Sequence, residues 1–371
     1  MKILVAMSGG VDSSFAAASL KLQGHEVTGV TMKVWQDKDR AAQASSELGL
    51  VEMPKAPENS CCGAEAMADA RSVAQAMDFP YYVLNYEDTF KKNVIEFFIS
   101  EYMEGRTPNP CVACNDKVKF DPLMKAALGL KMDKLATGHY AKVEMGADGA
   151  YHLYKATDLS KDQTYFLYRL GQDQLSRLLF PLGGMAKEEV RRRSEEIGLS
   201  TARKPESMDI CFVPQGGDYG EVIRRLHPEA AVEGPVLNTK GEELGRHQGI
   251  AFYTVGQRKG LGVSSATPLY VVRLDRTRNA VVVGDDKDLL SDKARVSSVH
   301  WVSGRAPQGP LSASVKIRSS HPGAAASILP CENGNCELHF EVPQRAITPG
   351  QAAVFYAGEE CLGGGVLELE S

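Results

Sequence analysis

The first half of the chain alternates short apolar runs with helical patterns. Short apolar runs that we expect to be strands lie at residues 3–7, 25–34, 81–85 and 135–139. Between them, the alanine and leucine spacing of residues 13–22 and of residues 64–77 favours helices. Strands that alternate with helices build a parallel sheet with crossover connections. We therefore expect an α/β domain over residues 1–205, ended by Pro205.

The pattern changes beyond residue 234, where glycines separate short runs of β-branched residues. These runs, which we expect to be strands, lie at residues 249–255, 270–274, 280–284, 296–302, 313–317 and 352–356. We expect a small central mixed domain over residues 206–280 and an all-β, barrel-like domain over residues 281–371.

Composition narrows the class of protein. The 42 basic and 47 acidic residues leave a net charge of −5, so the whole molecule is not expected to attract a polyanion, although a local basic face is compatible with this balance. No run approaches the roughly 18 apolar residues of a membrane span, and the N-terminus reaches glycines too soon for a signal peptide. We expect a cytoplasmic protein without membrane contact, whose eight cysteines are reduced thiols, metal ligands or redox catalysts.

The string SGGVDSS at residues 8–14 lies between the first expected strand and the first expected helix. Its glycines let backbone N–H groups approach an anion, and a helix N-terminus adds positive potential. The string lacks the lysine of a Walker A loop and the spaced glycines of a dinucleotide fingerprint. The alternative is a tight turn with a helix cap from Ser8 or Asp12. The complete string favours nucleotide binding.

Three cysteines stand out by their surroundings. Cys111 and Cys114 form a C-x-x-C motif in the stretch TPNPCVACN, where the prolines stiffen the chain and a following helix would favour thiolates. A structural zinc site would need four ligands, and the remaining cysteines form no matching second pair. Cys211, beside Ile210 and Phe212, is by itself typical of a buried apolar position.

Together these motifs resemble known families. SGGVDSS resembles the PP-loop of the N-type ATP pyrophosphatases, which cut ATP between its α and β phosphates to form an adenylate. With NPCVACN and Cys211 added, essentially the whole chain resembles the MnmA/TrmU family of tRNA-specific 2-thiouridylases. Further matching stretches are Cys61-Cys62, KDQTYFL at 161–167, YTVGQRKGLG at 253–262 and TPGQ at 348–351.

The resemblance implies ATP- and Mg²⁺-dependent 2-thiolation of the wobble uridine of tRNA. Transfer of AMP to the C2 oxygen of the uridine would turn that oxygen into a good leaving group. Cys211 would then carry sulfur as a persulfide, and Cys114 would attack that persulfide or resolve it through a disulfide. The implied nucleotide-binding residues are Met7, Ser8, Gly9, Gly10, Val11, Asp12, Ser13, Ser14, Met32 and Gly138. The implied catalytic residues are Asp12, Cys111, Cys114 and Cys211.

This chain departs from the family pattern at Cys111, where many members have an aspartate that is expected to handle protons near the target base. A thiol is a weaker acid, so the usual acid and base assignment is open at this position. Cys111, Cys114 and Cys211 also resemble the three thiolates that hold a [4Fe-4S] cluster in related tRNA thiolases. The persulfide route and the cluster route are both open, and Cys61 and Cys62 are interpreted as buried thiols without an assigned role.

The resemblance also implies contacts with tRNA. Asn109, Pro110 and Cys111 match the loop around the flipped-out base. Other positions that match tRNA contacts are His139, Lys161, Asp162, Gln163, Arg318, Ser319 and Gln351. Each alone is more typical of an ordinary surface or turn residue, but the set together favours a large polyanion, and we interpret the Arg191–Arg193 run as a solvated face. The expected partners are tRNAs that read Lys, Glu and Gln codons and a cysteine desulfurase or relay protein, with a monomeric enzyme.

Two other functions remain in competition. A PP-loop amidotransferase or synthetase acting on a small carboxylate would explain SGGVDSS, but it leaves Cys114, Cys211 and the β domain without a role. A non-enzymatic RNA-binding sulfur carrier would have a vestigial nucleotide loop, and the intact Asp12 and Ser13 argue against it.

Overall fold

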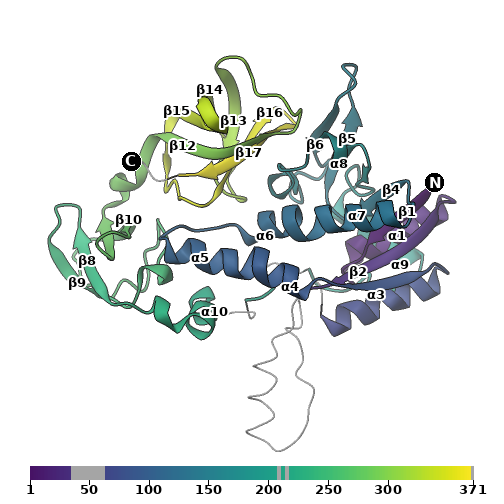
Figure 1. The fold of residues 1–371 in the computed structure, drawn as a ribbon, viewed down its shortest axis with the longest axis horizontal. Helices are drawn as coiled ribbons and strands as arrows, with labels where there is room; N and C mark the ends of the chain where they lie inside the picture. Colours follow the sequence, from purple (N-terminus) through teal and green to yellow (C-terminus); the bar gives the residue numbers. More distant parts are fainter. Residues whose placement is uncertain (35–62, 207–209, 214–216, 369–371) are drawn as a thin grey trace, which may run out of the picture. The chain divides into compact units, whose positions relative to one another are not determined.

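The computed structural model describes residues 1–34, 63–206, 210–213 and 217–368. The chain divides into two compact units, of which the first combines residues 1–94 with 113–217 and the second combines 95–112 with 218–371. Helices and strands carry the labels of Figure 1. Cys61 and Cys62 lie outside the described residues.

The first unit is built on a parallel sheet in the order β3-β2-β1-β4-β7. Its strands are β1 (Lys2–Ala6), β2 (Glu26–Lys33), β3 (Tyr81–Asn85), β4 (Lys134–Thr137) and β7 (Leu178–Leu179). Leu4 of the central strand pairs with Thr28 on one side and with Leu135 on the other. Ile3, Leu4 and Val5 are fully buried, as expected for a strand covered on both faces.

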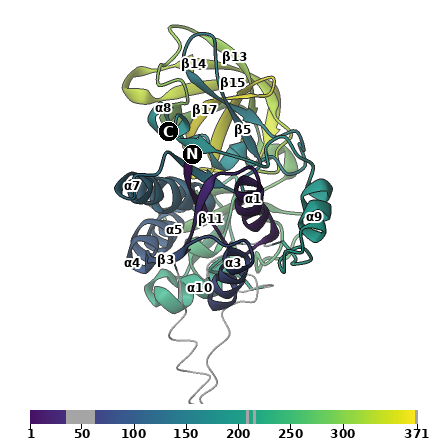
Figure 2. The same cartoon turned by 90° about the vertical axis from the view of Figure 1, so that its right-hand side faces the viewer.

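Helices cover both faces of this sheet. The helix α1 (Val11–Leu22) contacts β1, β2 and β4, and α7 (Asp121–Gly129) contacts β1 and β4. Figure 2 shows the sheet between these two helices. The helices α3 (Ala64–Ala76) and α9 (Lys187–Glu196) pack against α1. The small, fully buried Ala16, Ala17 and Ala18 let α1 approach the sheet closely.

The remaining elements of the first unit surround this sheet. They are α4 (Glu87–Phe90), η2 (Cys114–Phe120), β5 (Ala141–Met145), β6 (Tyr151–Lys155), η3 (Thr164–Phe166) and α8 (Gln172–Leu175). The strands β5 and β6 pair as an antiparallel hairpin, which the sequence pattern did not predict. The helical segment η1 (Lys91–Glu96) lies where the first unit ends and the second begins.

The second unit contains a small mixed sheet in the order β10-β11-β8-β9, in which β8 and β11 run parallel. Its strands are β8 (Gly234–Asn238), β9 (Glu243–His247), β10 (Tyr270–Asp275) and β11 (Ala280–Gly284). Its core contains the fully buried Val236, Val271, Val281 and Val283. The helices of this unit are α5 (Phe97–Met103), α6 (Pro110–Ala113), α10 (Tyr219–Leu226), η4 (Pro228–Ala230), η5 (Ile250–Phe252), η6 (Asp286–Leu289) and η7 (Glu332–Gly334).

The second unit also contains a closed antiparallel barrel (Figure 1). Its strands are β12 (Leu290–Trp301), β13 (Leu311–Lys316), β14 (Ala324–Pro330), β15 (Cys336–Arg345), β16 (Ala352–Ala357) and β17 (Glu360–Leu367). The long β12 pairs with β15 and with β17, which closes the barrel and leaves no open edge. Val315, Ile328, Leu338 and Phe355 fill its interior.

The expected fold class is confirmed: a parallel-sheet α/β region is followed by a small mixed sheet and a closed antiparallel barrel. The expected strand at 249–255 is wrong. Gly249 has a φ of 141° there, and the chain forms the 3-10 turn η5 instead, which buries Ile250 and Tyr253 in the small core. The division at 205/206 and 280/281 stays a prediction. Within the described part of the chain, no helix is long and apolar enough to cross a membrane.

Candidate functional site: a phosphate loop tied to a buried lysine

The loop between β1 and α1 has the geometry of an anion cradle. Gly9 has a φ of 68°, and Gly10 forms the extended N-cap of α1, which no side chain among the described residues caps. The Ser13 hydroxyl accepts a hydrogen bond from the Ser8 amide at 3.0 Å, so the first turn of α1 stabilises the start of the loop. Ser14 Oγ is buried and has no hydrogen-bond partner within the described residues. The first-turn N–H groups of α1 are therefore available to a phosphate, which fits the predicted nucleotide.

Three further predicted nucleotide residues lie around this cradle. A Cβ on Gly138 would stand 2.6 Å from the Ser13 amide nitrogen, so only glycine permits the approach of the β4 end to α1. Met7 and Met32 are buried, and the Thr31 hydroxyl donates to the Met7 carbonyl at 2.7 Å. These positions belong to the carboxyl ends of β1, β2 and β4, where open parallel sheets bind ligands.

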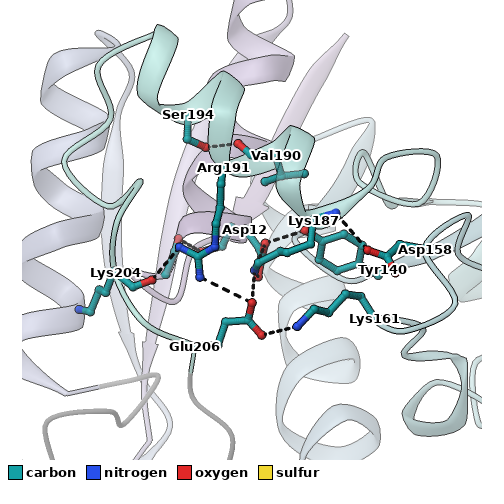
Figure 3. A network of polar contacts seen from close by, with 12 residues as sticks. Asp12, Tyr140, Asp158, Lys161, Lys187, Val190, Arg191, Ser194, Lys204 and Glu206 are labelled. Carbon is teal, nitrogen blue, oxygen red and sulfur yellow. Dashed lines mark hydrogen bonds and ion pairs between the residues drawn. The ribbon is translucent and has the colours of Figure 1, made fainter.

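An almost fully buried lysine, Lys187, pairs with Asp12 of the phosphate loop (Figure 3). The Lys187 ammonium lies 2.7 Å from both carboxylate oxygens of Asp12, and only 4% of its side chain is exposed. The Tyr140 hydroxyl donates to the same carboxylate at 2.8 Å. Burial and the neighbouring Asp12 charge raise the pKa of Tyr140, which keeps this phenol a donor.

Glu206 extends the network beyond Asp12. Its carboxylate accepts from Lys161 at 2.8 Å and pairs with Lys187 at 3.2 Å and with Arg191 at 3.6 Å. Burial raises the pKa of Glu206, but the hydrogen bonds from Lys161 and Lys187 outweigh it and bring the pKa below its usual value. Lys187 thus pairs with carboxylates of two segments: Asp12 of the phosphate loop and Glu206, which lies five residues before Cys211 in the sequence.

The sequence analysis missed Lys187, Tyr140 and Glu206. One signal was available, because Lys187 is the first residue of α9, where the helix dipole disfavours a cation unless anions lie nearby. The interpretation of the arginine run as a solvated face is wrong for Arg191, whose guanidinium also donates to the Ala202 and Lys204 carbonyls. The next two arginines form exposed ion pairs with glutamates of the same helix.

The three predicted cysteines occupy different settings. Cys211 is half-buried in the first unit, where its neighbour Phe212 packs edge-on against Phe90 with ring centroids 6.0 Å apart. Cys114 is also half-buried in the first unit, whereas the exposed Cys111 belongs to the second unit. Among the described residues, no group of three or more His, Cys, Asp or Glu side chains could hold a metal ion.

Several predicted tRNA contacts have partners inside the protein. Asp162 accepts from the Thr164 hydroxyl at 2.7 Å, and Gln163 accepts from the Tyr140 amide at 2.9 Å. Lys161 is paired with Glu206, as described above. Arg318 and Ser319 are exposed at the end of β13, so they remain accessible to a large ligand.

His139 is held as a neutral ring. It packs beside Phe120 and Phe180, with ring centroids 5.7 and 6.1 Å away, and its Nδ1 lies 2.7 Å from the Thr137 hydroxyl. Burial, together with the positive charge of Lys119, lowers the pKa of His139 to about 3. Any contact of His139 with RNA would therefore use hydrogen bonding or stacking and not charge.

Comparisons with known proteins cover nearly the whole chain. Residues 1–215 match the family described as tRNA methyl transferase HUP domain, residues 221–285 the tRNA methyl transferase PRC-barrel domain, and residues 291–367 the aminomethyltransferase beta-barrel domain. A tRNA-specific 2-thiouridylase MnmA from Roseiflexus sp. (strain RS-1) is 46% identical over 382 residues, which cover 98% of both chains. The chain belongs to the MnmA family.

Other members of the MnmA family are equally similar along their full length. The tRNA-specific 2-thiouridylase MnmA of Acetivibrio thermocellus is 45% identical and covers 99% of both chains. A solved 4-thiouridine synthetase–RNA complex with bound ATP matches 62% of this chain and 50% of its own at 14% identity, with a TM-score of 0.33. The full-length matches to MnmA proteins confirm the resemblance expected from the sequence motifs.

Replacement of Lys187 tests the buried pair. Lys187→Met leaves the Asp12 and Glu206 carboxylates without their shared cation, and we expect a loss of about 2 kcal/mol in the free energy of unfolding, measured by urea denaturation. The matched control is Lys161→Met, whose side chain is 32% exposed and should cost less than about 1 kcal/mol. Equal losses for the two variants would contradict a special role of the buried ammonium.

The pKa of His139 predicts a pH dependence of stability. The unfolded imidazole takes up a proton near its ordinary pKa of about 6.5, whereas the folded one stays neutral until about 3, so the stabilisation present above pH 6.5 is lost as the pH falls. Between pH 7 and pH 5 we expect the wild type to lose about 2 kcal/mol more than His139→Gln in urea denaturation. Parallel pH profiles for the two proteins would contradict this, because they would mean that the folded imidazole takes up its proton over the same pH range as the unfolded one.

Proposed function

We propose that this protein thiolates the C2 position of the wobble uridine of tRNA in an ATP-dependent reaction. Its full-length relatives are named tRNA-specific 2-thiouridylases. The structural observation that carries the proposal is that one compact unit contains both the phosphate loop and the two half-buried cysteines Cys114 and Cys211. An adenylation site and a sulfur-transfer site would thus belong to the same compact unit.

The phosphate loop would bind ATP at the N-terminus of α1. Gly9, Gly10 and Ser13 would present backbone N–H groups to the phosphates, and Gly138 keeps the opposite wall close. Mg²⁺ would stabilise the charge of the departing pyrophosphate. The Tyr140 hydroxyl and the Lys187 ammonium fix the orientation of the Asp12 carboxylate.

Sulfur delivery would use the two cysteines of the first unit. The terminal sulfur of a Cys211 persulfide would attack C2 of the adenylated uridine, and AMP would leave with the C2 oxygen. The Cys114 thiolate would then attack the Cys211 sulfur, which releases the 2-thiouridine and forms a Cys114–Cys211 disulfide. A thiol reductant would reduce this disulfide, and a cysteine desulfurase or relay protein would renew the persulfide.

The tRNA would contact both exposed and loop residues. The proposed contacts are Asn109, Pro110 and Cys111 around the target base and His139, Lys161, Asp162, Gln163, Arg318 and Ser319 elsewhere. Cys111 would lie beside the base, where other family members have a carboxylate. We further propose that the substrates are tRNAs for Lys, Glu and Gln and that the enzyme is a cytoplasmic monomer.

The reaction is tested directly with unmodified tRNA, ATP, Mg²⁺ and a charged sulfur donor, followed by nucleoside analysis. We expect 2-thiouridine from the wild type, none from Cys211→Ala, and none from Asp12→Asn. Cys331→Ala is the matched control, because this exposed thiol lies in the barrel and should leave the yield unchanged. Absence of 2-thiouridine from the wild type with a charged donor would refute the proposal.

Cys111→Ala separates the persulfide route from the cluster route. The variant and the wild type are purified without oxygen, their iron is counted, and their 2-thiouridine yield is compared. For the persulfide route we expect no iron in either protein and formation of 2-thiouridine by the Cys111→Ala variant. Iron in the wild type that is lost together with activity in Cys111→Ala would favour the cluster.

A further inference from the structure

The residues just before the predicted base-binding loop are held by the barrel. The Thr107 amide donates to the Pro349 carbonyl at 2.8 Å. The side-chain amide of Gln351 donates to the Thr107 carbonyl at 2.9 Å and to the Pro108 carbonyl at 3.4 Å. Both partners are carbonyls, so only the amide nitrogen of Gln351 can make these contacts. All of these residues belong to the second unit.

The barrel side of this clamp is itself firmly anchored. The Gly350 amide donates to the Leu367 carbonyl, and the Leu367 amide donates to the Gln351 carbonyl, each at 2.8 Å. Gly350 has a φ of 90°, and a Cβ there would stand 2.9 Å from the Thr107 nitrogen. Only glycine therefore permits this close approach of the two backbones. Leu367 is fully buried in the barrel, so the clamp is continuous with the barrel core.

A second set of contacts holds Arg106. Its guanidinium donates to Glu101 at 2.8 Å and also to Glu368, whose carboxylate accepts from the Ser297 hydroxyl as well. Burial disfavours the charge of Arg106, but the hydrogen bonds to Glu368 and Glu101 outweigh this and raise its pKa. Arg106 thus ties the end of α5 to the residue that follows β17.

The clamped residues lead directly into the base-binding loop. Asn109 Oδ1 accepts from the amides of Cys111 and Val112 at 3.1 and 3.2 Å and so caps the helix that begins at Pro110. Pro108 and Pro110 restrict the backbone on both sides of Asn109. With Thr107 fixed, few free torsions remain before Cys111.

We propose that Gln351 is a positioning residue of the Asn109–Cys111 loop, and that it acts on the reaction through the Thr107–Pro108 backbone. The sequence analysis predicts Gln351 as a tRNA contact, but its amide nitrogen is directed at two protein carbonyls. The barrel then holds the Asn109–Cys111 loop in place. This inference rests on the proposed thiolation for its kinetic test and is independent of it for its structural test.

The kinetic test separates positioning from tRNA binding. Gln351→Ala removes both contacts, and Gln351→Glu faces the two carbonyls with an acceptor-only carboxylate. We expect turnover at saturating tRNA to fall about tenfold or more in both variants, because misplacement of a reacting group lowers kcat. The Kd for tRNA should stay within about twofold of the wild type. Gln308→Ala, an exposed glutamine of the same barrel region, should change neither quantity.

The structural test uses hydrogen exchange of the Thr107 amide and needs no activity. We expect faster exchange in Gln351→Ala and Gln351→Glu than in Gln308→Ala and the wild type, because the clamp then opens locally. If the wild type makes no 2-thiouridine, the proposed function fails while this readout still tests the clamp. Unchanged exchange would overturn the inference, as would a weakened Kd for tRNA with unchanged turnover, or faster exchange with unchanged turnover.

Discussion

The Lys187 ammonium is almost fully buried, and a buried charge is stable only where groups of opposite charge pair with it. Nearby carboxylates provide this pairing. Asp12 provides two oxygens and Glu206 a third, so the three donors of the ammonium all face carboxylates. The contact joins the phosphate loop, the start of α9 and Glu206. Removing Lys187 would leave Asp12 without its cation, whereas Glu206 would keep Lys161 and Arg191.

Each compact unit positions a different part of the proposed site. In the first unit, the parallel sheet brings the phosphate loop, Gly138 and Met32 to one edge, because the carboxyl ends of parallel strands meet there. In the second unit, backbone hydrogen bonds and the Gln351 amide hold the segment before Cys111 against the barrel. Cys111 and Cys114 therefore belong to different units, although they are three residues apart in the chain.

Charge in this protein is arranged locally. The net charge of −5 does not describe local groupings, because Lys161, Lys187 and Arg191 all gather around Glu206. Asp162, in contrast, accepts from the Thr164 hydroxyl and so orders its own loop. Two adjacent residues, Lys161 and Asp162, thus have different roles: Lys161 joins the network at Glu206, and Asp162 shapes its own loop.

The sequence by itself determined the strands β1, β2 and β3, the helices α1 and α3, and the cradle at Gly9 and Gly10, because these depend on short-range periodicity and on a contiguous motif. It did not predict the β5–β6 hairpin, and it placed a strand at 249–255 where the chain turns. Only the tertiary structure decided the partners of Lys187, which lies 175 residues from Asp12, and the hold of Gln351 on Thr107, 244 residues away. Such pairings depend on which surfaces the packed sheet and barrel bring together, and no local pattern encodes that.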